Sequence, residues 1–188
     1  YHNQLDTREV ARALSFLRNR PITFEPRRRW AGPRSGKIQN AIEPGRTLCY
    51  LADPGWGEQL LDAKRNHGKV SDDLVEAAAM VINEWLPTFE GNIVYVPSLD
   101  PQRTLVGDFA GRLADVLDIP LSHCIVKTRH NRPQKLMQNS AQQVRNISGV
   151  FTVVEPVPPG PVILVDDIVD SRWTMALLGD LLMRAGTG

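Results

Sequence analysis

Hydrophobic residues recur three or four positions apart in several stretches of this chain, a spacing that is typical of amphipathic helices. Such helices are predicted over residues 7–18, 56–65, 72–86, 109–117 and 173–183. Ser71 is a favourable N-cap for the third of them, and Asp72 and Asp73 complement the positive end of its dipole. Pro87 ends the same helix.

Short runs of consecutive apolar residues lie between the helices of the C-terminal half and predict strands. These runs occupy residues 93–96, 124–126, 149–154 and 162–165. Strands without polar alternation are typical of a parallel sheet that helices cover on both faces. The pattern therefore predicts an α/β fold.

Residues 31–45 break this periodicity, because they are rich in Gly, Pro, Ser, Asn and basic residues. We interpret them as a loop or linker whose boundary falls near Gly45. The chain is thus divided into a small basic helical and linker extension, residues 1–45, and an α/β domain, residues 46–188.

The formal net charge of the 188 residues is only +1, but the basic residues are concentrated near the N-terminus. Between positions 18 and 46 lie Arg18, Arg20, Arg27, Arg28, Arg29, Arg34, Lys37 and Arg46, which only Glu25 and Glu43 oppose. A local positive field attracts phosphates, including those of DNA. A solvated connector without a partner is the alternative interpretation.

Composition excludes several classes of protein. No apolar run approaches the ~20 residues of a membrane span, and the first residues lack the pattern of a secretory signal. Cys49 and Cys124 are far apart, and the histidines show no paired spacing, so neither a disulfide framework nor a zinc site is predicted. We expect a cytoplasmic protein that does not contact a membrane.

The most informative motif follows the strand at residues 162–165, where Asp166 and Asp167 precede a short turn and a helix. In open α/β sheets, ligands bind at this end of the strands. The carboxylates can accept hydrogen bonds from sugar hydroxyls or hold Mg²⁺ through water. The N–H groups at the helix start, with the hydroxyls of Ser171 and Thr174, can bind a phosphate. The alternative is that the two acids merely cap or solvate the turn.

This segment resembles the phosphoribosyl-pyrophosphate (PRPP) signature of the type I phosphoribosyltransferases. The resemblance implies that fold, a parallel sheet with flanking helices. It implies that Asp166 and Asp167 are the catalytic pair, which faces the ribose. It places the 5′-phosphate on Asp170, Ser171, Arg172, Trp173 and Thr174. The family usually has glycine where Arg172 stands, so Arg172 either adds a cation to the loop or obstructs it.

Further motifs resemble the ComF-like branch of the same family over residues 93–188. Val-Pro-Ser-Leu at 96–99 follows the first strand, and Lys-Thr-Arg at 127–129 follows the second. The resemblance implies a pyrophosphate side formed by Pro97, Ser98, Lys127 and Arg129. The expected ligand is PRPP, or a nucleotide phosphate, with Mg²⁺. A family core continues into another strand, so we expect a truncated C-terminal end.

The N-terminal half resembles the region that follows the motor of certain bacterial RecQ-type DNA helicases, which carry a phosphoribosyltransferase-like domain. The similar motifs are Phe-Glu-Pro-Arg-Arg-Arg-Trp at 24–30, Gly-Arg-Thr-Leu at 45–48 and Asp-Pro-Gly-Trp-Gly-Glu at 53–58. The resemblance implies a piece of an ATP-dependent helicase of DNA repair and recombination. The sequence has no Gly-x-x-x-x-Gly-Lys-Ser/Thr loop, so ATP would be used only in the missing motor.

DNA contacts are predicted at Arg27, Arg28, Arg29 and Trp30. Trp30 either stacks on a base or packs against the neighbouring domain. Three hypotheses for the function stay open: a module that binds a sugar phosphate or nucleotide inside a helicase, an active phosphoribosyltransferase, and a docking module without ligand. Neither the acceptor base nor the oligomeric state is predicted.

Overall fold

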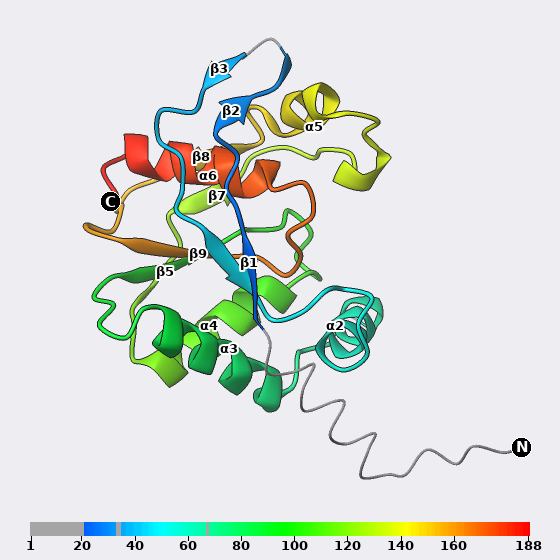
Figure 1. The fold of residues 1–188 in the computed structure, drawn as a ribbon, viewed down its shortest axis with the longest axis vertical. Coiled ribbons are helices and arrows are strands. Elements are labelled where there is room, and N and C mark those ends of the chain that lie inside the picture. Colours follow the sequence, from blue (N-terminus) through cyan, green and yellow to red (C-terminus); the bar gives the residue numbers. More distant parts are fainter. Residues whose placement is uncertain (1–20, 33–34, 67) are drawn as a thin grey trace, which may run out of the picture.

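The computed structural model of the chain describes residues 21–32, 35–66 and 68–188 (Figure 1). The helix predicted over residues 7–18 lies outside these ranges. The helices are α2 (Trp56–Arg65), α3 (Asp72–Trp85), α4 (Leu105–Leu117), α5 (Ser140–Ile147) and α6 (Trp173–Arg184), with a 3₁₀ turn η2 (Gln134–Leu136). The strands are β1 (Ile22–Phe24), β2 (Arg29–Trp30), β3 (Gly36–Lys37), β4 (Gly45–Thr47), β5 (Asn92–Tyr95), β6 (Leu121–Ser122), β7 (Ile125–Lys127), β8 (Phe151–Val153) and β9 (Val162–Val165).

A three-stranded parallel sheet in the order β6-β5-β9 forms the centre of the molecule. Ile93 of β5 is in register with Leu121 of β6 and with Ile163 of β9. Along each strand of this sheet, the side chains alternate between two cores, because neighbouring residues of a strand point to opposite faces. The α/β fold class is therefore confirmed.

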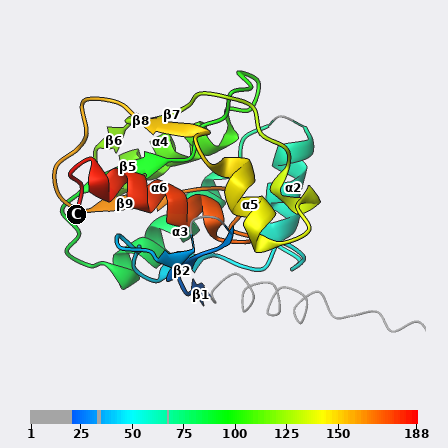
Figure 2. The same cartoon turned by 90° about the horizontal axis from the view of Figure 1, so that it is seen from above.

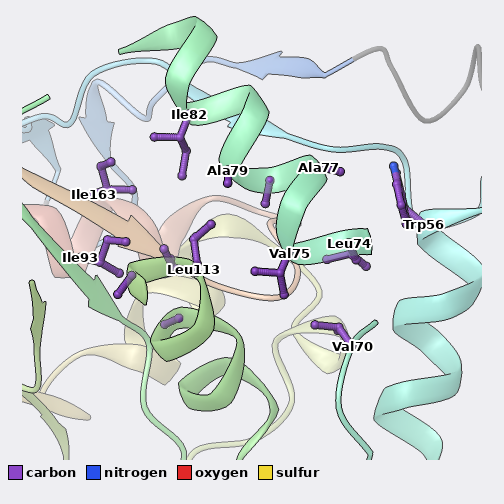
Figure 3. Close-up of a cluster of buried hydrophobic side chains, with 14 of the residues drawn as sticks. Trp56, Val70, Leu74, Val75, Ala77, Ala79, Ile82, Ile93, Leu113 and Ile163 are labelled. Carbon is purple, nitrogen blue, oxygen red and sulfur yellow. The ribbon is translucent and has the colours of Figure 1, made fainter. Parts of the chain in front are cut away.

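The central sheet lies between helices, as both views show (Figures 1 and 2). On one face, Ile93 and Ile163 belong to a core that includes residues of α3 and α4, and Figure 3 shows them gathered with Ile82 and Leu113. On the other face, Val94 belongs to a second core that includes Leu178 and other residues of α6. Val94 and Leu178 are completely buried. Packing in this core therefore fixes α6 against the sheet, and α6 begins after the turn that follows the twin acids, Asp166 and Asp167.

The strands β7 and β8 depart from the prediction. They pair with each other antiparallel, with Ile125 opposite Val153 and Lys127 opposite Phe151. Their inclusion in the parallel sheet was therefore wrong. The physical reason is a one-sided environment: Ile125 and Phe151 are buried, whereas their neighbours Val126 and Thr152 face solvent. An antiparallel pair tolerates one exposed face, unlike the doubly covered parallel sheet.

Several predicted helices are confirmed. Both ends of α2 are as expected, and α3 begins after Ser71, whose hydroxyl oxygen accepts a 3.3 Å hydrogen bond from the backbone N–H of Leu74. The observed α4 begins one turn before the predicted start. The polar sequence did not predict α5, which Asn139 caps by accepting a 3.0 Å hydrogen bond from the N–H of Gln142.

The described part of the N-terminal extension packs on α6. Ile38 is 1% exposed and belongs to the second core. The amide of Asn40 donates a 3.1 Å hydrogen bond to the buried carboxylate of Asp180 in α6. The strand β1 pairs antiparallel with β4, with Phe24 opposite Gly45. The division at residue 45 stays a prediction, and residues on its two sides are in direct contact.

In the described parts of the chain, no helix combines the length and the apolar character that crossing a bilayer requires.

Candidate functional site

The twin acids lie at the carboxyl edge of the parallel sheet. Asp166 and Asp167 follow β9 directly. The N–H of Val96, just after β5, donates a 2.9 Å hydrogen bond to the carbonyl oxygen of Val165. Pro97 and Ser98 therefore leave the sheet at the same edge as the two acids, as predicted for parallel strands. Ser98 uses its hydroxyl oxygen locally, where it accepts a 3.1 Å hydrogen bond from the N–H of Asp100.

Asp167 forms an ion pair that the sequence did not predict. Its Oδ2 atom lies 2.5 Å from the ammonium nitrogen of Lys64, in the last turn of α2. The side chain of Asp167 is 16% exposed and that of Lys64 is 37% exposed. The pair thus lies at the surface end of the site, and Lys64 is a residue of the site that no local motif signals.

The surroundings of Asp166 raise its pKa and so favour the protonated form of its carboxyl group. Burial, followed by the charge of Asp167, raises the pKa of Asp166 from 3.8 to about 7. A 2.8 Å hydrogen bond from the backbone N–H of Asp167 to Asp166 Oδ1, and the charge of Lys64, act in the opposite direction. Near neutral pH, Asp166 is therefore close to the midpoint of its titration.

Lys127 lies within electrostatic reach of Asp166, and its role on the pyrophosphate side stays a prediction. Burial and then the charge of Arg103 lower the pKa of Lys127, and Asp166 opposes that shift. Its ammonium lies 5.7 Å from the ring centroid of Phe151. Arg129 is directed elsewhere, because its guanidinium donates a hydrogen bond to the carbonyl oxygen of Ser148. The charges of Asp166 and Arg103 thus both act on Lys127, and the sequence did not predict the effect of Arg103.

The turn before α6 has the backbone shape that a glycine would favour. Arg172 has φ 66° and ψ 4°, in the left-handed region, and is the N-cap residue of α6. Residues other than glycine are uncommon in the left-handed region, because their Cβ atom comes too close to the backbone. The guanidinium of Arg172 donates a 2.9 Å hydrogen bond to the carbonyl oxygen of Glu25, in the N-terminal extension.

The extension also reaches this turn through Arg27 and Trp30. The Nε atom of Arg27 donates a 3.0 Å hydrogen bond to the carbonyl oxygen of Ser171. Its guanidinium lies 4.6 Å from the ring centroid of Trp173, which stacks on Trp30 at 6.2 Å. Trp173 is 2% exposed, so these contacts are made inside the fold. Two residues predicted for DNA, Arg27 and Trp30, therefore contact the predicted phosphate loop.

Positive charge accumulates beside the turn. Burial and then the charge of Arg172 lower the pKa of Arg27, which indicates that the two guanidinium groups are close. Within the described ranges, neither forms an ion pair with a carboxylate. Two like charges near the positive end of α6 favour an anion there.

The described residues around the acids form no cage of protein ligands for a magnesium ion. Among the described residues, no three His, Cys, Asp or Glu side chains are grouped to hold a metal, although one or two carboxylates can hold Mg²⁺ together with waters and the phosphates of a ligand. The Oδ2 atom of Asp167 is already bound to the ammonium of Lys64. Magnesium that arrives on a phosphorylated ligand stays a prediction.

The fold and the site define an α/β protein in which two acids, a left-handed turn and a buried helix follow one another at the carboxyl edge of a parallel sheet. Comparison with protein-family models, with curated proteins and with solved structures finds no match to this chain.

Proposed function

We propose that this chain is the C-terminal phosphoribosyltransferase-like module of a RecQ-type DNA helicase, and that it binds a phosphoribosyl or nucleotide phosphate. The observation that carries the proposal is the left-handed backbone of Arg172, in the turn that joins Asp166 and Asp167, just after β9, to the start of α6. This is the position at which the resembling family has glycine. The turn therefore has the backbone form that close approach to a phosphate requires, although the side chain is different.

The charges beside the turn support a phosphate as the ligand. The first N–H groups of α6 and the hydroxyls of Ser171 and Thr174 would donate to its oxygens. Arg27 and Arg172 would neutralise its charge. The ribose hydroxyls would then face Asp166 and Asp167, and Lys127 would lie on the side of a further phosphate.

We propose binding without phosphoribosyl transfer as the activity of this module. Arg172 and Trp173 are engaged with the extension through Glu25, Arg27 and Trp30, so the turn also serves to hold the extension in place. Arg129, which the resemblance assigns to the leaving pyrophosphate, donates instead to Ser148. The helicase context, and with it a role in DNA repair and recombination, is supported by the motifs at residues 24–30, 45–48 and 53–58.

Titration calorimetry with ribose 5-phosphate, AMP and PRPP, each with and without Mg²⁺, tests the proposal. We expect the parent protein to bind at least one of them and the double variant Asp166→Asn/Asp167→Asn to bind it at least about tenfold more weakly, a loss of about 1.4 kcal/mol. The control is Asp115→Asn, on the exposed side of α4.

Two results would contradict the proposal in different ways. Absence of binding to all three ligands would leave the docking module as the function. Release of pyrophosphate from PRPP with a panel of purine and pyrimidine bases would identify an active phosphoribosyltransferase.

A further inference from the structure

We infer that Lys64 supplies a built-in cation to the twin-acid site, so that the sugar-phosphate ligand binds there without a divalent metal ion. This inference rests on the proposed function. The observation behind it is the 2.5 Å contact between the ammonium of Lys64 and Asp167, which joins residues 103 positions apart.

The packing of α2 determines where Lys64 lies. Trp56 and Ala63, on the same helix, are 6% and 8% exposed and belong to the first core. Gly57 fits tightly as well, since a Cβ atom there would lie 2.5 Å from the carbonyl oxygen of Leu51. The helix is therefore held in position, and its last turn brings Lys64 to the carboxyl edge of the sheet.

The ammonium of Lys64 can serve both the acids and a ligand. An ammonium has three N–H donors, and one of them is directed at Asp167. The side chain is 37% exposed, so the remaining donors can reach an oxygen of a ligand. Lys64 thus has the chemistry to bridge Asp167 and a hydroxyl or phosphate of a bound sugar phosphate.

The same position explains why a metal ion is not needed. Two adjacent carboxylates repel a phosphorylated ligand, and a divalent cation would remove that repulsion. Here the ammonium of Lys64, in contact with Asp167, offsets that negative charge, and its charge also acts on Asp166. A cation that binds Asp167 at Oδ2 must first displace Lys64, so Mg²⁺ and Lys64 compete for the same atom.

The first experiment measures ribose 5-phosphate binding by calorimetry, in EDTA and in Mg²⁺. We expect the parent to bind equally in both, within about twofold. Lys64→Met should bind at least about tenfold more weakly in EDTA and recover in Mg²⁺, whereas Lys64→Arg should retain most of the affinity. The control is Arg65→Met, which removes an adjacent charge whose side chain is 70% exposed. A parent that needs Mg²⁺, or a Lys64→Met variant that binds normally in EDTA, would overturn the inference.

The second experiment needs no ligand, so it separates this inference from the proposed function. Mn²⁺ binding is followed by electron paramagnetic resonance, and Lys64→Met should bind at least about fivefold more tightly than the parent. Adding Asp166→Asn/Asp167→Asn should remove that gain. Equal Mn²⁺ binding by the parent and Lys64→Met would show that Lys64 does not exclude metal from the acids. If ribose 5-phosphate binds under no condition but Lys64→Met still gains Mn²⁺, the proposed ligand fails while the competition stands.

Discussion

The Nε atom of Arg27 donates a 3.0 Å hydrogen bond to the carbonyl oxygen of Ser171, a residue 144 positions away. Arg172 makes the reciprocal contact, from its guanidinium to the carbonyl oxygen of Glu25 at 2.9 Å. An arginine of each segment thus donates a hydrogen bond to a backbone carbonyl oxygen of the other segment. The N-terminal extension and the turn before α6 are consequently parts of one structure, and a change in either should be measurable in the stability of the whole.

We expect Arg27→Ala to lower the free energy of unfolding by about 1–2 kcal/mol, because it removes a hydrogen bond from a charged donor and a cation–π contact with Trp173. Urea denaturation followed by tryptophan fluorescence measures this. The control is Arg28→Ala, whose side chain is exposed and whose loss should cost less than about 0.5 kcal/mol. Equal effects of the two substitutions would contradict the contact between Arg27 and the turn.

Arg172 offers a test of the backbone itself. Both Arg172→Ala and Arg172→Gly remove the hydrogen bond to Glu25, but only glycine adopts the left-handed conformation without cost. We therefore expect Arg172→Gly to be about 1 kcal/mol more stable than Arg172→Ala. Thermal and urea unfolding of the two variants give the difference directly. Equal stabilities would mean that residue 172 does not have φ 66° in solution.

Local sequence patterns predicted most of the helices because each depends on its own periodicity and caps. Ser71 caps α3 with its own hydroxyl, and the apolar run of β9 is confirmed as a parallel strand with Ile163 and Val165 buried. The pairing of β7 with β8 was missed because η2 and α5 separate the two strands along the chain, and no local pattern signals that they pair antiparallel. Strand pairing depends on the whole chain, which a local pattern does not contain.

The candidate site also has a part that the local sequence predicts and a part that depends on contacts between distant segments. Asp166, Asp167 and the turn to Thr174 are contiguous, so their proximity follows from the sequence alone. Lys64 reaches Asp167 through the packing of α2, and no residue near it signals that contact. In the sequence, Lys64 is an ordinary basic residue in the last turn of a helix. Nothing in that local pattern indicates that it lies close to the acids.

Asp166 should make stability depend on pH. Its pKa rises from 3.8 to about 7 on folding, so the folded protein holds this proton more tightly than the unfolded chain does. The contribution of Asp166 to stability therefore falls as the pH rises from about 4 to about 7 and stays constant above that range. We expect Asp166→Asn, which has no proton to lose, to raise the free energy of unfolding by about 1–3 kcal/mol at pH 8 relative to its effect at pH 4.5. Urea titrations of both proteins at the two pH values measure this, and a pH-independent difference would contradict the shift.

The strands β2 and β3 place basic side chains opposite one another. Arg29 is in register with Lys37, and Arg28 precedes the pair. All three residues are exposed. Like charges in directly opposite positions destabilise a two-stranded sheet, and an anionic partner would relieve that repulsion. We call Arg28, Arg29 and Lys37 the basic hairpin.

We expect the basic hairpin to supply most of any affinity for single-stranded DNA, because Arg27 is already engaged with Ser171 and Trp173. The variant Arg28→Ala/Arg29→Ala should bind an oligonucleotide about tenfold or more weakly at low salt. Its log–log slope against salt concentration should be less steep by about 0.7 for each phosphate contact that is lost. Fluorescence anisotropy over a series of salt concentrations measures both quantities. The matched control, Arg65→Ala/Lys69→Ala, removes two exposed charges from another surface; if it weakens binding equally, the attraction is general to the protein's charge and does not belong to the hairpin.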